Sequence, residues 1–258
     1  MDESKRSFLK IAGTSVLGTL GVACNSLPLQ TPGQAESLPE GLSAKKWGMV
    51  VDTKKCSQEK GCTACIEACH QTHNVPTIDN PEEEVKWIWK ESYEDAFPTQ
   101  AHPYTEKTLK DQSVLVLCNH CESPPCVRVC PTQATWKREA DGLVMMDQHR
   151  CIGCRYCIVA CPYGSRSFNW SDPRPHIDQE PTPDFPTRTK GVVEKCNFCA
   201  ERLARGLQPA CVDACEADAL VFGDLEDPRS QVSLILQEKH SIRRKPNLGT
   251  GPQVYYLV

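Results

Sequence analysis

The sequence lacks a hydrophobic run long enough to cross a membrane. The apolar stretch from Ile11 to Ala23 covers about thirteen residues, whereas a helix needs about 20 residues to cross roughly 30 Å of hydrocarbon. We therefore expect this chain to have no transmembrane helix of its own.

A surplus of basic residues is also missing. The 29 Lys and Arg residues are outnumbered by 33 Asp and Glu residues, which gives a net charge of -4. Such a chain offers no broad positive field to the phosphate backbone of DNA or RNA. We therefore expect no nucleic-acid partner.

Two residue types are abundant in this chain of 258 residues, a length that allows one or two domains. Its twenty prolines indicate many loops and turns. Its seventeen cysteines exceed what a reduced cytosolic enzyme normally carries, so their arrangement is the main clue to function.

The first residues are typical of an export signal. Basic residues precede the apolar run, and the pair Lys5-Arg6 followed by Phe8-Leu9-Lys10 resembles the twin-arginine signal, which is read on proteins that fold before export. Because Lys5 replaces the first arginine, either this variant acts alone or an exported partner carries the chain across. We predict a signal and the start of a linker over residues 1–35, a linker over 36–44, and a periplasmic location.

Cys24 ends a segment that loosely matches a lipoprotein cleavage box. The match is poor at Gly21, and cleavage near Ala35 is the alternative that we favour over a lipid anchor at Cys24. Without a lipid or a spanning helix, the chain would reach the membrane through partner subunits.

The other sixteen cysteines form four groups of four, and each group ends in Cys-x3-Cys. The third group, Cys151, Cys154, Cys157 and Cys161 followed by Pro162, matches the bacterial ferredoxin run C-x2-C-x2-C-x3-C-P. In that run, the first three thiolates hold one [4Fe-4S] cluster and the fourth ligates a neighbouring cluster.

The second group keeps this plan, with two more residues before its third cysteine. Between the two groups, Asp141-Gly142 predicts a hairpin with a two-residue turn. Groups two and three therefore form one two-cluster unit in which the fourth ligands are exchanged. The predicted ligands are Cys118, Cys121, Cys126 and Cys161 for one cluster, and Cys130, Cys151, Cys154 and Cys157 for its neighbour.

Groups one and four are looser, but each again offers three cysteines and then one. Since the inner pair is complete, their remaining partners are each other. The predicted ligands are Cys56, Cys62, Cys65 and Cys215 for a third cluster, and Cys69, Cys196, Cys199 and Cys211 for a fourth.

Disulfides and zinc are the alternatives for these cysteines. Seventeen cysteines in 258 residues, about 7%, fall below the roughly 8 to 10% that marks small disulfide scaffolds. Structural zinc usually pairs two short C-x2-4-C knuckles. The C-x2-C-x2-C-x3-C run of the third group has more closely spaced thiols than one tetrahedral zinc ion needs. We therefore favour iron-sulfur clusters.

Several motifs together resemble the four-cluster iron-sulfur subunits of the dimethyl sulfoxide reductase type. They are Cys130–Ala134, Asp141–Gly142, Cys151–Arg155, Ala160–Gly164, Lys195–Cys199 and Pro209–Val212. The resemblance runs from about Trp47 to Tyr256. Trp47–Asp52 and Ala68–Pro76 look most like the periplasmic iron-sulfur subunit of the Dsr sulfur-metabolism membrane complex.

The resemblance implies an electron-transfer subunit with four [4Fe-4S] clusters and no catalytic residues of its own. Its implied partners are a quinone-interacting integral membrane subunit and a cytochrome c-type subunit. A molybdopterin subunit, as in polysulfide or tetrathionate reductases, is the alternative to the cytochrome. A redox-sensing protein is a third possibility, which the export signal disfavours.

We expect an α+β fold of two bacterial-ferredoxin-like two-cluster units, one inserted in the other, with loop-rich insertions. The predicted outer unit covers residues 45–75 and 190–222, and the inner unit covers 111–170. Residues 76–110, 171–189 and 223–258 are predicted insertions and a C-terminal extension.

Other residues favour structural roles. We expect His70, His73 and His120 to be solvated or hydrogen-bonding neighbours of cluster ligands. Trp87-Ile88-Trp89 favours strand packing over a docking patch. The proline-rich segment 172–186 is a predicted surface loop, and Glu82–Glu84 a solvated face.

Overall fold

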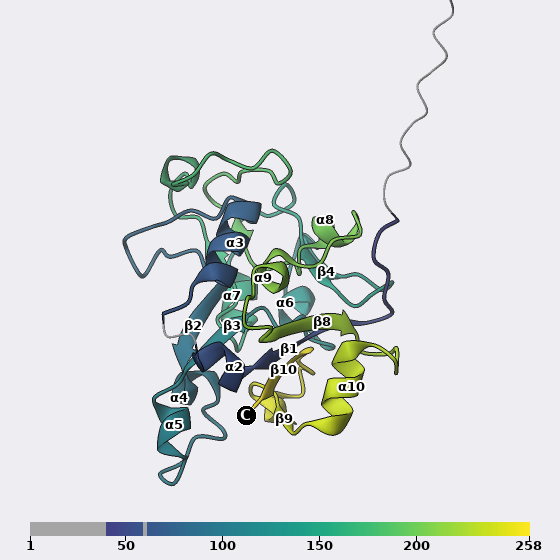
Figure 1. Cartoon of the computed structure of the whole chain (residues 1–258). Coiled ribbons are helices and arrows are strands. Elements are labelled where there is room, and N and C mark those ends of the chain that lie inside the picture. The colour runs from purple at the N-terminus through teal and green to yellow at the C-terminus, as the bar shows by residue number, and fades with distance from the viewer. Residues whose placement is uncertain (1–39, 59–60) are drawn as a thin grey trace, which may run out of the picture. The chain divides into compact units, whose positions relative to one another are not determined.

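A computed structural model of the chain describes residues 40–58 and 61–258 (Figure 1). The predicted export signal, residues 36–39 of the linker and Cys24 lie outside the described residues. Within the described part of the chain, no helix is long and apolar enough to cross a membrane.

The largest sheet joins the beginning and the end of the described chain. It has four strands in the order β8 (Leu220–Asp224), β1 (Trp47–Asp52), β10 (Val254–Leu257) and β9 (Ser241–Ile242). β1 lies in the middle of the sheet, and both of its edges are paired. This position fits its residues, which are almost all buried and apolar. It runs antiparallel to β8 and parallel to β10. Helix α10 (Gln231–Glu238) packs on this sheet through Val232.

Short helices carry the first and last cysteine groups. α2 (Thr53–Gln58) and α3 (Ala64–His73) follow β1, and α3 ends at Asn74, which adopts a left-handed conformation. α8 (Ala200–Leu203) and α9 (Ala210–Asp213) belong to the last group. α9 packs against α3, so the two groups lie together although they are far apart in sequence (Figure 1).

The insertion between residues 76 and 110 is folded into the core. Strand β2 (Ile88–Ser92) pairs antiparallel with β3 (Ser113–Leu117), and α4 (Tyr93–Ala96) and α5 (Lys107–Lys110) lie between them in sequence. Trp87, Ile88 and Trp89 are all buried. This run therefore packs inside the protein, as the strand interpretation predicts, and it is not a docking patch.

The middle cysteine groups flank the predicted hairpin. β4 (Thr135–Lys137) and β5 (Val144–Met146) pair antiparallel, and the short helices α6 (Pro125–Arg128) and α7 (Tyr156–Ala160) lie against each other. β6 (Ser167–Phe168) pairs with β7 (Val193–Glu194). The 3₁₀ turns η1 (Arg174–His176) and η2 (Pro246–Leu248) complete the elements.

The predicted two-residue turn of this hairpin is wrong. The two strands are separated by residues 138–143, and within that loop Gly142 adopts a φ of 78°. The Asp141 carboxylate accepts hydrogen bonds from Arg138 and from Trp47 Nε1, and the Asp141 carbonyl accepts one from the Trp47 backbone N–H. The loop is longer because Asp141 ties it to the start of β1.

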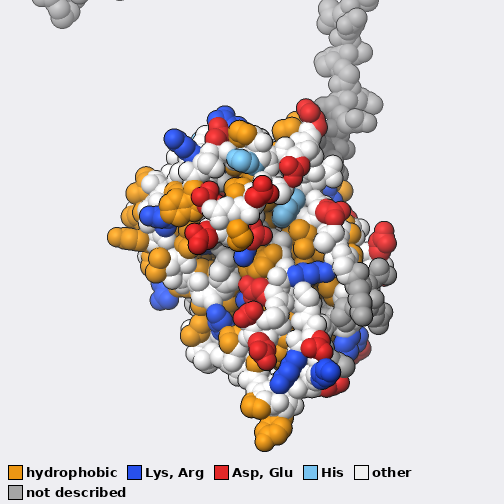
Figure 2. Space-filling model, turned by 90° about the vertical axis from the view of Figure 1, so that its left-hand side faces the viewer, with side chains coloured by type: hydrophobic (Ala, Val, Ile, Leu, Met, Phe, Trp, Pro, Cys, Tyr) orange, Lys and Arg blue, Asp and Glu red, His pale blue; other side chains and the backbone are white. Residues whose placement is uncertain are grey.

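The fold is mixed α+β with small sheets, as expected for ferredoxin-like dicluster domains. On the face shown in Figure 2, Lys and Arg side chains are interspersed with Asp and Glu side chains. That face presents no broad field of positive charge, in line with the net charge of -4.

Candidate metal centres

The sixteen cysteines of the described chain gather in four sets, and none of them forms a disulfide there. We name these the first to fourth thiol sets. Three of them each line a cavity. The thiols of the remaining set, the second, are buried as close neighbours of one another. The first set is Cys56, Cys62, Cys65 and Cys215; the second is Cys69, Cys196, Cys199 and Cys211; the third is Cys118, Cys121, Cys126 and Cys161; the fourth is Cys130, Cys151, Cys154 and Cys157.

Each set thus brings together three cysteines of one sequence group and one from another. That each set ligates one cluster stays a prediction. The reason for this grouping of the cysteines lies in the Cys-x3-Cys spacing. Residues four apart lie on the same face of a helix, about 6 Å apart along its axis. On α7, Cys157 joins the fourth set and Cys161, at the end of the helix, joins the third. On α3, Cys65 and Cys69 are divided between the first and second sets in the same way.

Gly153 allows the loop of the fourth set to coil tightly. Its φ of 69° is in the left-handed region, and a Cβ atom there would clash with the carbonyl oxygen of Gly191. The Gly153 N–H also points at Cys151 Sγ, at 3.4 Å. Only glycine fits this position, which explains Gly153 in the loop between Cys151 and Cys154.

Backbone N–H groups point at several of the sulfur atoms. Phe198 N lies 3.4 Å from Cys196 Sγ, Ala210 N lies 3.4 Å from Cys199 Sγ, and Ala219 N lies 3.3 Å from Cys215 Sγ. Such donors stabilise negative charge on sulfur and tune the potential of a bound cluster.

The electrostatics of the sets fit a bound cationic centre. Burial, reinforced by the neighbouring thiolate of Cys118, raises the pKa of Cys121 to about 12. Burial and the neighbouring Cys56 thiolate likewise raise the pKa of Cys65 to about 12. Cluster binding requires deprotonated thiols, so the iron of a [4Fe-4S] cluster supplies the positive charge that four such thiolates need in a buried site. The donor set and the cavities both suit that cofactor.

Neighbouring sets are close enough for their thiolates to repel. Burial and the nearby Cys118 of the third set raise the pKa of Cys196, in the second set, to about 12. Cys65 of the first set acts on Cys211 of the second, and Cys126 of the third acts on Cys157 of the fourth. The sets therefore follow one another in the order first, second, third, fourth.

The two ends of this row reach the surface, whereas the second set does not. Cys62 of the first set and Cys154 of the fourth are exposed. All four cysteines of the second set are buried. A centre in the first or fourth set thus lies close to the surface, whereas the described residues cover all four thiols of the second set.

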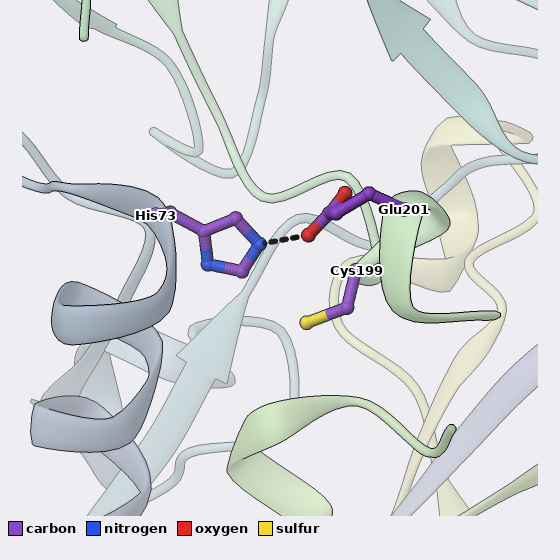
Figure 3. Close-up of side chains that lie close together, drawn as sticks. All are labelled: His73, Cys199 and Glu201. Atoms are coloured by element: carbon purple, nitrogen blue, oxygen red, sulfur yellow. Dashed lines mark hydrogen bonds and ion pairs between the residues drawn. The ribbon is translucent and has the colours of Figure 1, made fainter. Parts of the chain in front are cut away.

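His73 is buried and supports the second set. Its Nε2 lies 2.7 Å from Glu201 Oε1, and its Nδ1 lies 2.9 Å from the Cys69 carbonyl oxygen. Figure 3 shows His73, Glu201 and Cys199 together, with the imidazole turned toward the carboxylate. Both ring nitrogens have hydrogen-bond partners, and Cys199 belongs to the second set. His73 and Glu201 therefore form part of the structure that encloses this set.

His120 has a similar supporting role between the second and third sets. Its Nδ1 accepts a hydrogen bond from the Val144 N–H at 3.0 Å, so its Nε2 carries the proton and donates to the Cys196 carbonyl at 3.2 Å. The ring stacks on Phe198. The sequence predicted that these histidines are either solvated or hydrogen-bonded. His73 and His120 are buried and hydrogen-bonded.

Two buried basic residues near the thiol sets were not predicted from the sequence. Lys195 precedes Cys196 and donates from Nζ to the Cys196 carbonyl at 2.5 Å, and Arg166 borders the third set. Both stand within a few residues of a cysteine group. Basic residues beside the cysteine groups are frequent in this sequence, as at Lys55, Arg150 and Arg155, so position in the sequence did not single these two out.

The comparisons with known proteins agree with this geometry. Residues 112–174 and 184–225 match the family described as 4Fe-4S dicluster domain. The Hdr-like menaquinol oxidoreductase iron-sulfur subunit 1 of Archaeoglobus fulgidus is 39% identical, over 98% of this chain and 97% of its own length. This chain belongs to the iron-sulfur subunits of the dimethyl sulfoxide reductase and Hdr-like menaquinol oxidoreductase family.

Other members of this family are similar over most of their length. One of the subunits of the tetrathionate reductase of Salmonella typhimurium is 37% identical, over 100% of this chain and 89% of its own. The iron-sulfur cluster-binding subunit of the menaquinone reductase of Nitratidesulfovibrio vulgaris is 37% identical, over 82% and 88%.

Membership of the family defines the general role of this subunit. It is an iron-sulfur electron-transfer subunit of an oxidoreductase complex, and it carries [4Fe-4S] clusters. Its sixteen described cysteines are consistent with four of them. The family therefore favours iron-sulfur clusters over the zinc and disulfide alternatives.

Proposed function

We propose that the four thiol sets bind four [4Fe-4S] clusters and that this subunit relays electrons one at a time through a Dsr-type sulfur-metabolism complex. It would connect a quinone-interacting integral membrane subunit with a cytochrome c-type subunit in the periplasm. The match to the Archaeoglobus relative, an iron-sulfur subunit of an Hdr-like menaquinol oxidoreductase, supports the quinone-linked part of this proposal. The tetrathionate reductase relative keeps a molybdopterin partner as the alternative.

The order of the thiol sets carries the proposal. A relay needs centres that are close to their neighbours and accessible only at the two ends. The chain's residues meet both needs, since adjacent sets interact through Cys65, Cys118 and Cys126 and the exposed thiols belong to the end sets. When bound, the clusters supply the one-electron carriers, whose potentials depend on hydrogen bonds, charge and solvent access.

The same arrangement supports the proposed domain organisation. The first and second sets combine cysteines from the first and last groups, whereas the third and fourth combine the middle groups. We propose that this reflects an inner ferredoxin-like unit inserted in an outer one.

Metal analysis of the purified subunit tests the number of clusters. We expect four iron and four acid-labile sulfide atoms for each of four clusters, and electron paramagnetic resonance signals of interacting reduced centres. A colourless protein without iron, with its thiols oxidised in pairs, would overturn the proposal.

The partners are tested by affinity purification from the native membrane. We expect this subunit to bring down a multihaem cytochrome and a quinone-interacting membrane protein. Recovery of a molybdopterin protein in place of the cytochrome would assign the subunit to a molybdenum oxidoreductase. Recovery of the intact subunit without any redox partner would refute both versions.

The surface around the exposed Cys154 carries several large apolar side chains beside charged ones such as Lys86 and Arg155. Ile152 is 66% exposed, Tyr156 is 62% exposed and Val159 is 87% exposed. Tyr156, Val159 and Trp170 line one surface cavity together with Cys154. Apolar groups gathered around an exposed thiol of a redox centre suit a permanent contact with a redox subunit.

We expect Val159→Glu to weaken the association of this subunit with its redox partner at least tenfold, because the change puts a charge into an apolar contact. Leu234→Glu, which alters an exposed leucine on α10, is the matched control and should leave association unchanged. Co-purification yields and electron transfer from a reduced quinol would measure the effect. Equal association of the two variants would show that the partner docks elsewhere.

A further inference from the structure

Arg166 is a buried cation beside the third thiol set. Its side chain belongs to the segment between Cys161 and β6, and the residue is only 4% exposed. It lines the cavity of the third set together with Cys118, Cys126 and Cys161. An arginine is always charged at physiological pH, so its positive charge lies inside the protein next to these thiols.

The guanidinium also reaches the wall of the fourth set. Its Nη2 donates to Thr135 Oγ1 at 2.7 Å, and its Nη1 lies 3.8 Å from Met146 Sδ. Thr135 and Met146 both line the cavity of Cys130, Cys151, Cys154 and Cys157. Arg166 thus stands between the two cavities and contacts the surroundings of both.

Arg166 differs from the other two buried arginines in its partners. Arg188 pairs with Glu194 at 2.6 Å and Arg244 pairs with Glu91 at 2.7 Å. Arg166 forms no ion pair with any carboxylate of the described residues. A buried charge without a partner is strongly destabilising. Burial lowers the pKa of Arg166, and the thiolates of Cys126, Cys157 and Cys118 more than offset this effect and raise that pKa. The positive charge is therefore balanced by the two thiol sets.

We propose that Arg166 is a shared positioning residue that raises the reduction potentials of the clusters in both the third and the fourth thiol sets. This inference rests on the proposed function. Reduction adds one electron, and hence one negative charge, to a cluster, and no bond forms or breaks. A fixed cation in a buried site stabilises the reduced form more than the oxidised form. One side chain thereby sets the second half of the relay at a higher potential.

The test is a redox titration of the loaded protein, followed by electron paramagnetic resonance. Arg166→Gln keeps hydrogen-bond donors but removes the charge, and Arg166→Lys keeps the charge. For Arg166→Gln we expect the equilibrium constants for reduction of the clusters in the third and fourth thiol sets to fall about tenfold. For one electron, this corresponds to a reduction potential lower by 59 mV. Arg166→Lys should restore most of the difference, and the other two clusters should keep their potentials.

Arg155→Gln is the matched control. Arg155 lies beside the fourth set, but it is exposed and stacks on Trp170, with its Cζ 4.6 Å from the ring centre. Because solvent and salt screen an exposed charge, this variant should change the equilibrium constant for reduction of each cluster by no more than about twofold. A shift as large as that of Arg166→Gln would mean that general surface charge, and not the buried cation, sets the potentials.

A second variant tests the inference if Arg166→Gln fails to assemble its clusters. Met146→Glu puts a carboxylate beside the guanidinium and leaves Arg166 in place, and Met146→Gln is its neutral control. We expect Met146→Glu alone to lower both potentials. Loaded variants with unchanged potentials would overturn the inference about Arg166, whereas a parent protein without iron would overturn the proposed function instead.

Discussion

Removal of iron and sulfide from the purified subunit is expected to abolish its compact fold. The thiols are part of the core, since Cys65, Cys69, Cys196 and Cys211 are buried in the same apolar cluster as Met49 and Phe198. Without the clusters, this core contains cavities lined by thiols in three of the four sets. Where a metal site does not exist in the unfolded chain, the free energy of metal binding is free energy of folding.

The expected loss of folding free energy is large compared with the stability of an ordinary domain. Native domains are stable by only about 5 to 15 kcal/mol, and here four cofactor sites share one chain of short helices and small sheets. The near-ultraviolet circular dichroism of the apoprotein should therefore be lost and its hydrodynamic radius should increase. Reconstitution with iron and sulfide should reverse both changes. A metal-free sample with native-like compactness and side-chain signals would contradict this expectation.

The short-range parts of the site were predictable from the sequence. The Cys-x2-Cys-x2-Cys-x3-Cys run encodes local geometry, because residues four apart on a helix share a face. Gly153 fits the same local logic, since its positive φ is needed within the loop. The combination of thiols from different groups followed from counting three plus one in each group, and the structure places those thiols together.

The long-range parts of the fold were not predictable from one sequence. The parallel pairing of β1 with β10 joins Met49 with Val254, and neither strand shows an alternating pattern that identifies its neighbour. The prediction of a two-residue turn in the hairpin was wrong because the hydrogen bond from Trp47 to Asp141 is a tertiary contact, which the local sequence does not reveal. Arg166 and the burial of His120 depend on which segments meet, and sequence spacing does not contain that information.

Replacing Glu194 by leucine is expected to destabilise the loaded protein by about 3 to 5 kcal/mol, the usual cost of removing one partner of a buried ion pair. Glu194 is completely buried and accepts hydrogen bonds from Trp87 Nε1 at 2.9 Å, Asn169 Nδ2 at 2.5 Å and Arg188 Nη2 at 2.6 Å. These donors come from three different parts of the chain. Arg188 also donates to the His73 carbonyl, so the network reaches α3.

The loss arises chiefly because Arg188 would remain as a buried charge without a partner. The double variant Glu194→Leu with Arg188→Met should therefore recover a substantial part of the stability, since an apolar pair can replace a buried ion pair. Asp184→Asn, which breaks the exposed pair with Arg205, is the matched control and should cost only about 0 to 1 kcal/mol. Chemical denaturation followed through the cluster absorbance would measure all three. If Glu194→Leu were no more harmful than Asp184→Asn, the network would not hold the insertion to the cluster-binding segments, and the packing of Trp87 and Phe185 on the His73 ring would have to do so alone.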